Sequence, residues 1–241
     1  MTKAVVLLSI GRNPASGRDR MARSDARAIE LALASFGEEH VMGLHAACTV
    51  SPVLRDYTGL GLRSVLCMNI RPGVDPADAL IERLGAIRPD VVLCGQSAET
   101  GRGTGMMAYA CAEALGYPVI ANVRTITQDG GELVVTQDMG KGRYRELRGP
   151  CPVVLALEAS QPPRRLPAMT YIRTGRIDIE THMSATEKDA AVADIRPARV
   201  RPRKSSQGAV SVIREPVIAD LDPDRAAARI LQYLRTNNII Q

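Results

Sequence analysis

The first half of the chain alternates short aliphatic runs with longer amphipathic stretches. Four of the runs are almost continuously aliphatic, which is typical of strands buried on both faces of a sheet. They are Val5–Ile10, Val41–Ala46, Val65–Met68 and Val91–Cys94. Strand and helix repeated in this order predict an α/β fold, a doubly wound and mostly parallel sheet with helices on both faces.

Two helix starts are visible in the stretches between the runs. The first stretch has apolar residues at helical spacing from Ala28 to Phe36, and we expect Ser24 and Asp25 to cap that helix. A later stretch opens with Asp75-Pro76, a capping residue followed by proline in the first helical position.

The pattern changes after residue 117. Three runs of alternating character, Val119–Thr127, Leu133–Gln137 and Tyr144–Leu147, are separated by glycine-containing turns. Such turns predict β-hairpins and hence an antiparallel addition to the sheet. A last aliphatic run, Pro152–Leu157, returns to core character.

The remainder of the chain predicts an appendage. Five positive charges and two prolines fall within Arg196–Lys204, a composition that cannot form a core. A capped amphipathic helix then starts at Asp222-Pro223 and needs a surface on which to dock. We therefore expect a nucleotide-binding domain over 1–160, a loop for partner recognition over 161–177, an extended basic arm over 178–221 and a docking helix over 222–241.

Composition excludes several function classes. The 241 residues include only 3% aromatics and no tryptophan, so stacking platforms for nucleic-acid bases are not expected. The net charge of +5 equals the surplus of the segment Arg164–Lys204, which has 10 basic and 5 acidic residues, so the positive charge is local, which also argues against nucleic-acid binding. Five unpatterned cysteines suggest free thiols in the cytoplasm, and three scattered histidines predict no metal site. The first aliphatic run is too short to insert into a membrane.

The most unusual segment lies between the run Val91–Cys94 and the helix expected over Met106–Leu115. It contains the candidate binding residues Gly95, Gln96, Ser97, Glu99, Thr100, Gly101, Gly103, Thr104 and Gly105. In an open parallel sheet, ligands bind beyond the carboxyl ends of the strands, where a helix N-terminus offers unpaired amides to a phosphate. Glycines let the backbone approach such a ligand closely, and the Thr104 hydroxyl can add a hydrogen bond. A flexible surface turn is the alternative interpretation.

Several segments taken together resemble the β subunit of electron-transfer flavoproteins. The segment Arg88–Ser97 is similar to the family's "PDLVLxGxQ" strand and loop, and Thr104-Gly105 to its nucleotide-binding "TG". Cys151–Ala156 is similar to the "xPAVxT" strand, and Gln161–Met169 to the "NxPRYxxLPxIM" loop. The resemblance runs from about residue 24 to about residue 177 and includes the terminal helix.

This resemblance implies an adenine nucleotide alpha hydrolase-like fold and a role in electron transfer without catalytic residues. The family's β subunit binds AMP and pairs with an α subunit that holds most of the FAD. By position, the AMP site falls on Ser9, His45 and the segment Gly95–Gly105, while Leu166, Pro167 and Met169 match the loop that docks a flavin-dependent dehydrogenase. In that loop Leu166 is an apolar residue among prolines and charges, which suits an anchor; packing on its own domain is the alternative.

The family's "NPxD" is replaced by Ala22-Arg23-Ser24-Asp25, and the segment 95–105 is shorter than usual. Three alternatives therefore stay open. One is a variant with a second FAD in place of AMP. Another is a stand-alone nucleotide sensor of the universal stress type. The third is a nucleotide-processing enzyme that uses Glu99 or His45 as its base.

Overall fold

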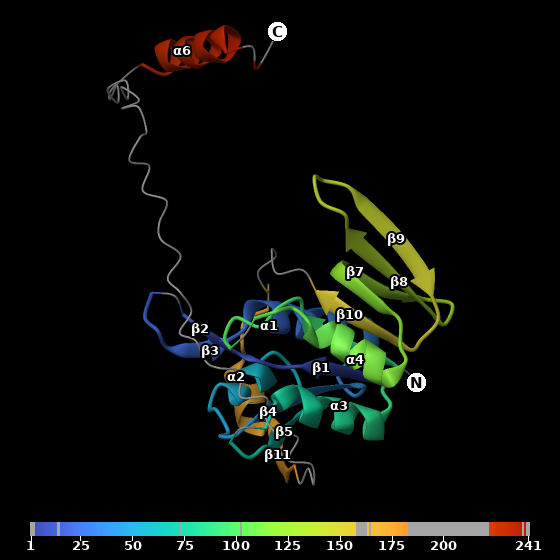
Figure 1. Cartoon of the computed structure of the whole chain (residues 1–241). Helices are drawn as coiled ribbons and strands as arrows, with labels where there is room; N and C mark the ends of the chain where they lie inside the picture. The colour runs from blue at the N-terminus through green and yellow to red at the C-terminus, as the bar shows by residue number, and fades with distance from the viewer. Residues whose placement is uncertain are drawn as a thin grey trace. The chain divides into compact units, whose positions relative to one another are not determined.

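The computed structural model describes residues 3–13, 15–72, 74–101, 103–157, 163, 165–182, 222–237 and 239. The chain divides into two compact units, residues 1–193 and 194–241. The first unit contains the sheet (Figure 1). The basic segment Arg196–Lys204 and most of the arm predicted over 178–221 lie outside the described residues.

Nine strands form one sheet in the first unit, in the order β11-β5-β4-β1-β6-β10-β7-β8-β9. The strands from β11 to β7 run parallel to their neighbours, and β8 and β9 continue the sheet in antiparallel fashion. Their bounds are β1 Ala4–Leu7, β4 Val41–Ala47, β5 Ser64–Asn69, β6 Val91–Gly95, β7 Val119–Asp129, β8 Glu132–Asp138, β9 Tyr144–Gly149, β10 Val153–Leu157 and β11 Arg176–Thr181. The doubly wound, mostly parallel sheet with an antiparallel addition is thus confirmed.

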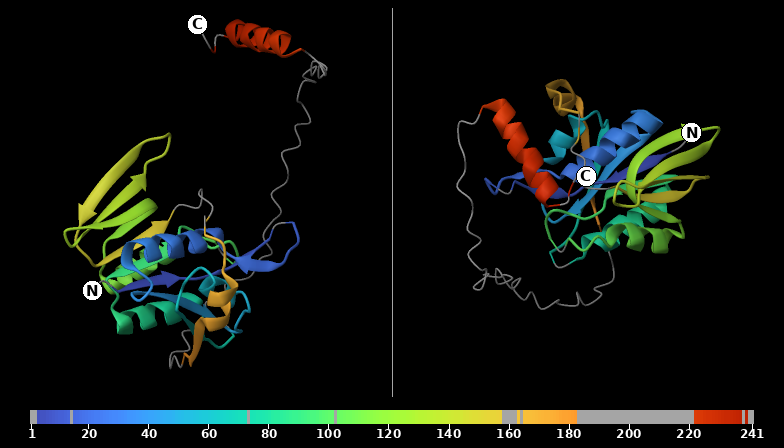
Figure 2. Two further views of the ribbon diagram at one scale, coloured as in Figure 1. Left: turned by 180° about the vertical axis from the view of Figure 1, so that it is seen from behind. Right: turned by 90° about the horizontal axis from the view of Figure 1, so that it is seen from above.

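Helices cover both faces of the sheet, as Figures 1 and 2 show from opposite sides. On one face α1 (Arg23–Phe36) and α2 (Leu54–Thr58) bury one aliphatic cluster, and on the other α3 (Pro76–Ile87) and α4 (Met107–Leu115) bury a second. Successive residues of β1 alternate between the two clusters, because neighbouring side chains of a strand point to opposite faces. The strands are therefore buried on both sides, which explains their continuous aliphatic sequence.

The predicted start of α3 is confirmed. Asp75 is the N-cap residue and accepts a hydrogen bond from the Ala77 amide at 3.0 Å, with Pro76 as the first helical residue. The turns of the antiparallel addition are also where glycines predicted them. Gly130 and Gly131 both adopt positive φ between β7 and β8, a conformation that glycine reaches at little cost.

Three features differ from the sequence-based expectations. A small hairpin of β2 (Ile10–Arg12) and β3 (Asp19–Met21) precedes α1. Helix α1 begins at Arg23 with Ala22 as its N-cap residue, so the prediction that Ser24 and Asp25 cap it is wrong. Strand β11 pairs with β5 up to Thr181, so residues expected to begin the arm belong to the sheet.

A short helix and the terminal helix complete the described elements. Helix α5 (Met169–Thr174) leads into β11. In the second unit, α6 (Pro223–Thr236) confirms the predicted terminal helix. Its residues Ile230, Leu231 and Tyr233 are exposed, so the apolar stripe of the helix is uncovered within the described residues of the chain.

Candidate functional site

The glycine-rich segment Gly95–Gly105 lies at the point where the winding of the sheet changes direction. From β1 the chain crosses to β4 on one side, and it later returns to β6 on the other side of β1. The loops that follow β1 and β6 therefore diverge at adjacent strand ends, and doubly wound sheets bind their ligands in the crevice that this leaves. Ser9 follows β1 and Gly95 ends β6, so the topology brings these two predicted residues to the same edge.

Three glycines shape the loop. Gly101, Gly103 and Gly105 all have positive φ, at 73°, 55° and 72°. A Cβ on Gly105 would lie 2.9 Å from the Gln96 carbonyl oxygen, so the two ends of the loop approach closely only because residue 105 has no side chain. The loop therefore turns back on itself directly before α4, while Gln96, Ser97 and Thr104 are exposed.

Amide groups are available at this turn. Met106 is the N-cap residue of α4 and has no side-chain oxygen to cap the helix. The Thr104 hydroxyl accepts a hydrogen bond from the Met106 amide at 3.3 Å. The amides of Ala98, Thr104 and Gly105 have no acceptor among the described residues. Unpaired amides at a helix N-terminus, together with the positive end of the helix dipole, favour an anion. The loop can therefore accept a phosphate group.

Glu99 lies at the surface, where both of its carboxylate oxygens are engaged. Its Oε2 pairs with the Arg20 guanidinium at 2.7 Å, and its Oε1 accepts a hydrogen bond from the Arg23 amide at 2.9 Å. Thr100 adds a bond from its hydroxyl to the Ile10 carbonyl at 2.6 Å. The predicted residues Glu99 and Thr100 thus connect the loop to the β2–β3 hairpin and to α1. Glu99 therefore has a structural role, which the sequence around it did not indicate.

Ser9 points into a buried polar network. Its amide and its hydroxyl both donate to Oδ2 of Asp25, at 2.7 and 2.6 Å. Its carbonyl accepts from the Tyr57 hydroxyl at 2.7 Å, and that hydroxyl in turn accepts from the Ala22 amide at 2.8 Å. Burial raises the pKa of Asp25 to about 6 and raises the pKa of Tyr57 as well. Sequence reasoning identified Ser9 but missed Asp25 and Tyr57 as its partners.

His45 lies on β4 and is 5% exposed. Its Nδ1 is 2.8 Å from the Leu8 carbonyl oxygen, which can only accept, so Nδ1 carries the proton. Burial lowers the pKa of His45, which keeps the ring neutral. Its Nε2 is buried and has no hydrogen-bond partner among the described residues. His45 is thus positioned beside the end of β1 as a neutral ring with a free acceptor.

Leu166 stands out on the surface of the first unit. Its side chain is 86% exposed, although leucine is usually buried. The residues around it are fastened: the Arg165 guanidinium donates to the Leu60 carbonyl at 2.8 Å, and the Ala168 amide donates to the Gly59 carbonyl at 2.9 Å. The chain therefore presents Leu166 from a segment tied down on both sides, with Met169 also exposed. The alternative that Leu166 packs on its own domain is wrong.

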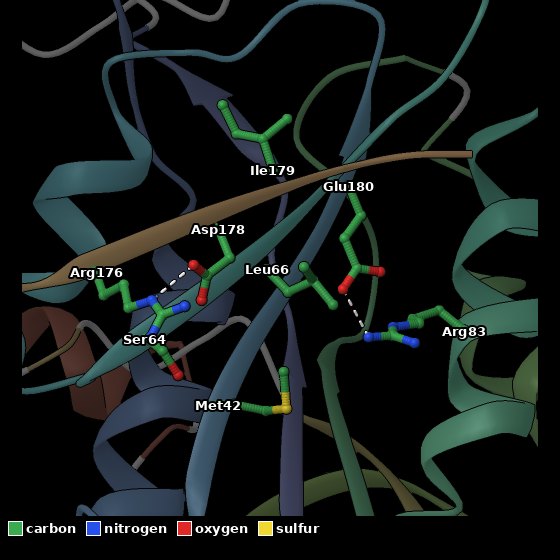
Figure 3. Close-up of a pocket in the computed structure, with 8 residues that line it drawn as sticks. All are labelled: Met42, Ser64, Leu66, Arg83, Arg176, Asp178, Ile179 and Glu180. Carbon is green, nitrogen blue, oxygen red and sulfur yellow. Dashed lines mark hydrogen bonds and ion pairs between the residues drawn. The ribbon is translucent and has the colours of Figure 1, made fainter. Parts of the chain in front are cut away.

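A groove of about 380 Å³ lies elsewhere, along β5, β11 and α3 (Figure 3). Arg176 pairs with Asp178 at 2.6 Å and Arg83 with Glu180 at 2.8 Å, and the figure shows Ile179 pointing to the other side of β11. Both arginines of the groove are already paired with carboxylates. The groove is therefore a poorer phosphate site than the glycine loop, whose amides are unpaired.

Metal-binding clusters and membrane-spanning helices are both absent from the described residues. No group of histidine, cysteine and acidic side chains in this part of the chain is arranged to hold a metal ion. Likewise, none of the described helices combines the length and the apolar character needed to cross a membrane.

The chain is similar to a known protein family and to a protein of that family. The profile of the electron transfer flavoprotein domain matches residues 15–198. Electron transfer flavoprotein subunit beta of Chromohalobacter salexigens is 30% identical over 257 aligned positions, which cover 99% of this chain and 96% of that protein. The matched region includes both the glycine loop and the segment that presents Leu166.

Proposed function

Because the chain belongs to the electron transfer flavoprotein family as a beta-like subunit, we propose that it binds AMP at the glycine loop and pairs with an alpha subunit that carries most of the FAD. In this proposal Leu166 docks a flavin-dependent dehydrogenase, from which electrons pass through the flavin to a downstream acceptor. The observation that carries the proposal is the match to an electron transfer flavoprotein beta subunit over nearly the whole chain.

The nucleotide part of the proposal is supported by the position of the loop and by its free donors. The amides of Thr104 and Gly105 and the N-terminus of α4 form one donor set at the edge where β1 and β6 end. The N-terminus of α1, by contrast, is already occupied by the Glu99 carboxylate. We therefore place the phosphate of AMP at α4, with Ser97 and Thr104 in reach and with Gln96 and His45 lining the site.

The partner part of the proposal is supported by exposed apolar side chains in both compact units. We assign the uncovered stripe of α6, with Ile230 and Leu231, to the alpha subunit, because a lone amphipathic helix gains stability only by packing. We assign Leu166, Pro167 and Met169 to the dehydrogenase. A single anchoring side chain suits a transient redox contact, since such interfaces are small.

Co-expression with an electron transfer flavoprotein alpha subunit tests the proposal. We expect a yellow heterodimer that releases AMP and FAD in equal amounts on denaturation, measured by absorbance and mass spectrometry. Release of FAD alone, in twice that amount, would indicate the variant with a second FAD. A colourless homodimer that does not bind an alpha subunit would contradict the proposal and favour a stand-alone nucleotide sensor.

A further inference from the structure

Asp25 is a buried carboxylate that belongs to neither the expected helix cap nor an ion pair. It is the third residue of α1 and 4% exposed, and the N-cap residue of that helix is Ala22. None of the ion pairs between described residues includes Asp25. Burying a charge without a cation nearby is unfavourable, so a buried charged side chain is normally stabilised by hydrogen bonds.

The donors around Asp25 come from the end of β1 and from the first turn of α1 itself. The Ser9 amide and hydroxyl, at the end of β1, both donate to Oδ2, and the Ser24 hydroxyl donates to Oδ1 at 3.3 Å. All three groups donate to Asp25, and the Ser9 amide can only donate, so residue 25 serves as an acceptor here. An ionised carboxylate fills that role, whereas an amide would turn two N–H groups toward existing donors.

The glycine loop begins against this carboxylate. A Cβ on Gly95 would lie 2.7 Å from Oδ1 of Asp25 and 2.2 Å from the Ser24 hydroxyl, so only glycine permits the approach. The next residue, Gln96, donates its amide to the Leu157 carbonyl at the end of β10, at 2.9 Å. Asp25 is therefore the point where the ends of β1 and β6 and the start of α1 meet.

We propose that Asp25 is a positioning residue of the nucleotide site, which fixes Ser9 and the first residues of the glycine loop in the arrangement that binds the phosphate. The identity of the ligand rests on the proposed function, but the ordering of the loop by Asp25 does not. The carboxylate acts through Ser9 and Gly95 and is not assigned a contact with the nucleotide.

The variant Asp25→Asn tests this inference, with Asp78→Asn as its control. Asp78 is the third residue of α3, as Asp25 is of α1, but it is exposed and its helix begins away from the glycine loop. Amide hydrogen exchange is measured on the full chain at Arg23 and Gln96, whose amides bond to Glu99 and Leu157 and not to Asp25. Acceleration at these two amides beyond that of core strand amides reports ordering transmitted from Asp25, because a global loss of stability would accelerate all protected amides alike.

We expect exchange at Arg23 and Gln96 to accelerate about tenfold or more in Asp25→Asn, because charged hydrogen bonds are lost, and to stay unchanged in Asp78→Asn. The dissociation constant for added AMP should rise about tenfold in the same variant. Unchanged exchange at both amides would overturn the inference. If the wild-type chain binds no AMP, the proposed ligand fails, while the exchange result still decides the role of Asp25.

Ser9→Ala is the second variant, in case Asp25→Asn does not fold. It removes one donor to Oδ2 and leaves the carboxylate in place. The same two amides should exchange faster than in wild type, by a smaller factor than in Asp25→Asn. Exchange at the wild-type rate in Ser9→Ala would count against the inference by itself.

Discussion

Glu99 caps helix α1 from a distance of 76 residues: its Oε1 accepts the amide hydrogen of Arg23 at 2.9 Å. The same carboxylate holds Arg20, so one side chain of the glycine loop secures both the β3 strand and the first turn of the helix. The loop proposed to bind a nucleotide is thereby part of the frame of the domain.

Replacing Glu99 with alanine should lower the free energy of unfolding by about 1–2 kcal/mol, because the helix loses its cap and Arg20 its partner. Urea denaturation followed by circular dichroism measures the change. Glu113→Ala on the exposed side of α4 is the control and should change stability by less than about 0.5 kcal/mol. Equal effects of the two substitutions would show that the cap contributes nothing.

The stability of the chain should depend on pH through Asp25. Its pKa rises from an ordinary value of 3.8 to about 6 on folding, mainly through burial, so the folded state binds a proton between these values that the unfolded state has lost. The contribution of Asp25 is therefore most favourable below pH 4 and declines as the pH rises to 6, by about 3 kcal/mol in all. Unfolding of wild type and Asp25→Asn at several pH values should show wild type losing this much relative to the variant.

The titration of Asp25 can be distinguished from that of the neighbouring side chains Tyr57 and Cys94. The pKa values of Tyr57 and of Cys94, which lie on α2 and β6, are raised by burial, so both side chains stay neutral from pH 4 to 7. Glu99 and Arg20 pair with each other nearby. A difference between the two proteins that does not vary over this pH range would contradict the expected titration.

Gly95→Ala should destabilise the chain by about 1–3 kcal/mol and abolish nucleotide binding, because the added Cβ meets Ser24 and Asp25. Gly85→Ala is the matched control. Gly85 lies inside α3 with open space around its hydrogen, so alanine there should stabilise the helix by about 0.5–1 kcal/mol. Thermal unfolding and AMP titration compare the two; a tolerated Gly95→Ala would mean that α1 and the loop are not in contact.

Leu166→Ala should raise the apparent KM of the dehydrogenase reaction for the heterodimer about tenfold and leave FAD content and stability unchanged. The side chain is 86% exposed, so its truncation removes little buried surface from the chain itself. Met139→Ala removes another exposed side chain, from the turn between β8 and β9, and should leave the KM as it is. Loss of flavin from the Leu166 variant would show that this segment contacts the alpha subunit.

Much of the fold could be predicted because its signals are local. Continuous aliphatic runs mark strands buried on both faces, Asp75-Pro76 marks a helix start, and paired glycines mark the turn between β7 and β8. The position of the glycine loop follows from topology, since a segment between a parallel strand and a helix must lie at the carboxyl edge of the sheet. The exposure of Leu166 agrees with its surroundings of prolines and charges.

The features that escaped prediction depend on contacts between distant residues. Ser24 and Asp25 have the local sequence of a cap, but Glu99 caps the helix, which leaves Asp25 free to bond to Ser9. The β2–β3 hairpin has strands of three residues, too short for a detectable alternation. Strand β11 alternates isoleucine with acidic residues, and only its pairing with β5 distinguishes it from the polar segment that follows.

The two tethers that flank Leu166 have a consequence for the speed of encounter. A side chain on a flexible segment must be ordered each time a partner binds, and the loss of conformational entropy weakens every binding event. With Arg165 and Ala168 already bonded to the segment Gly59-Leu60, the immobilisation has taken place once, during folding. In the proposed function, a dehydrogenase can therefore bind Leu166 through a small interface and dissociate quickly, as electron transfer over many turnovers requires.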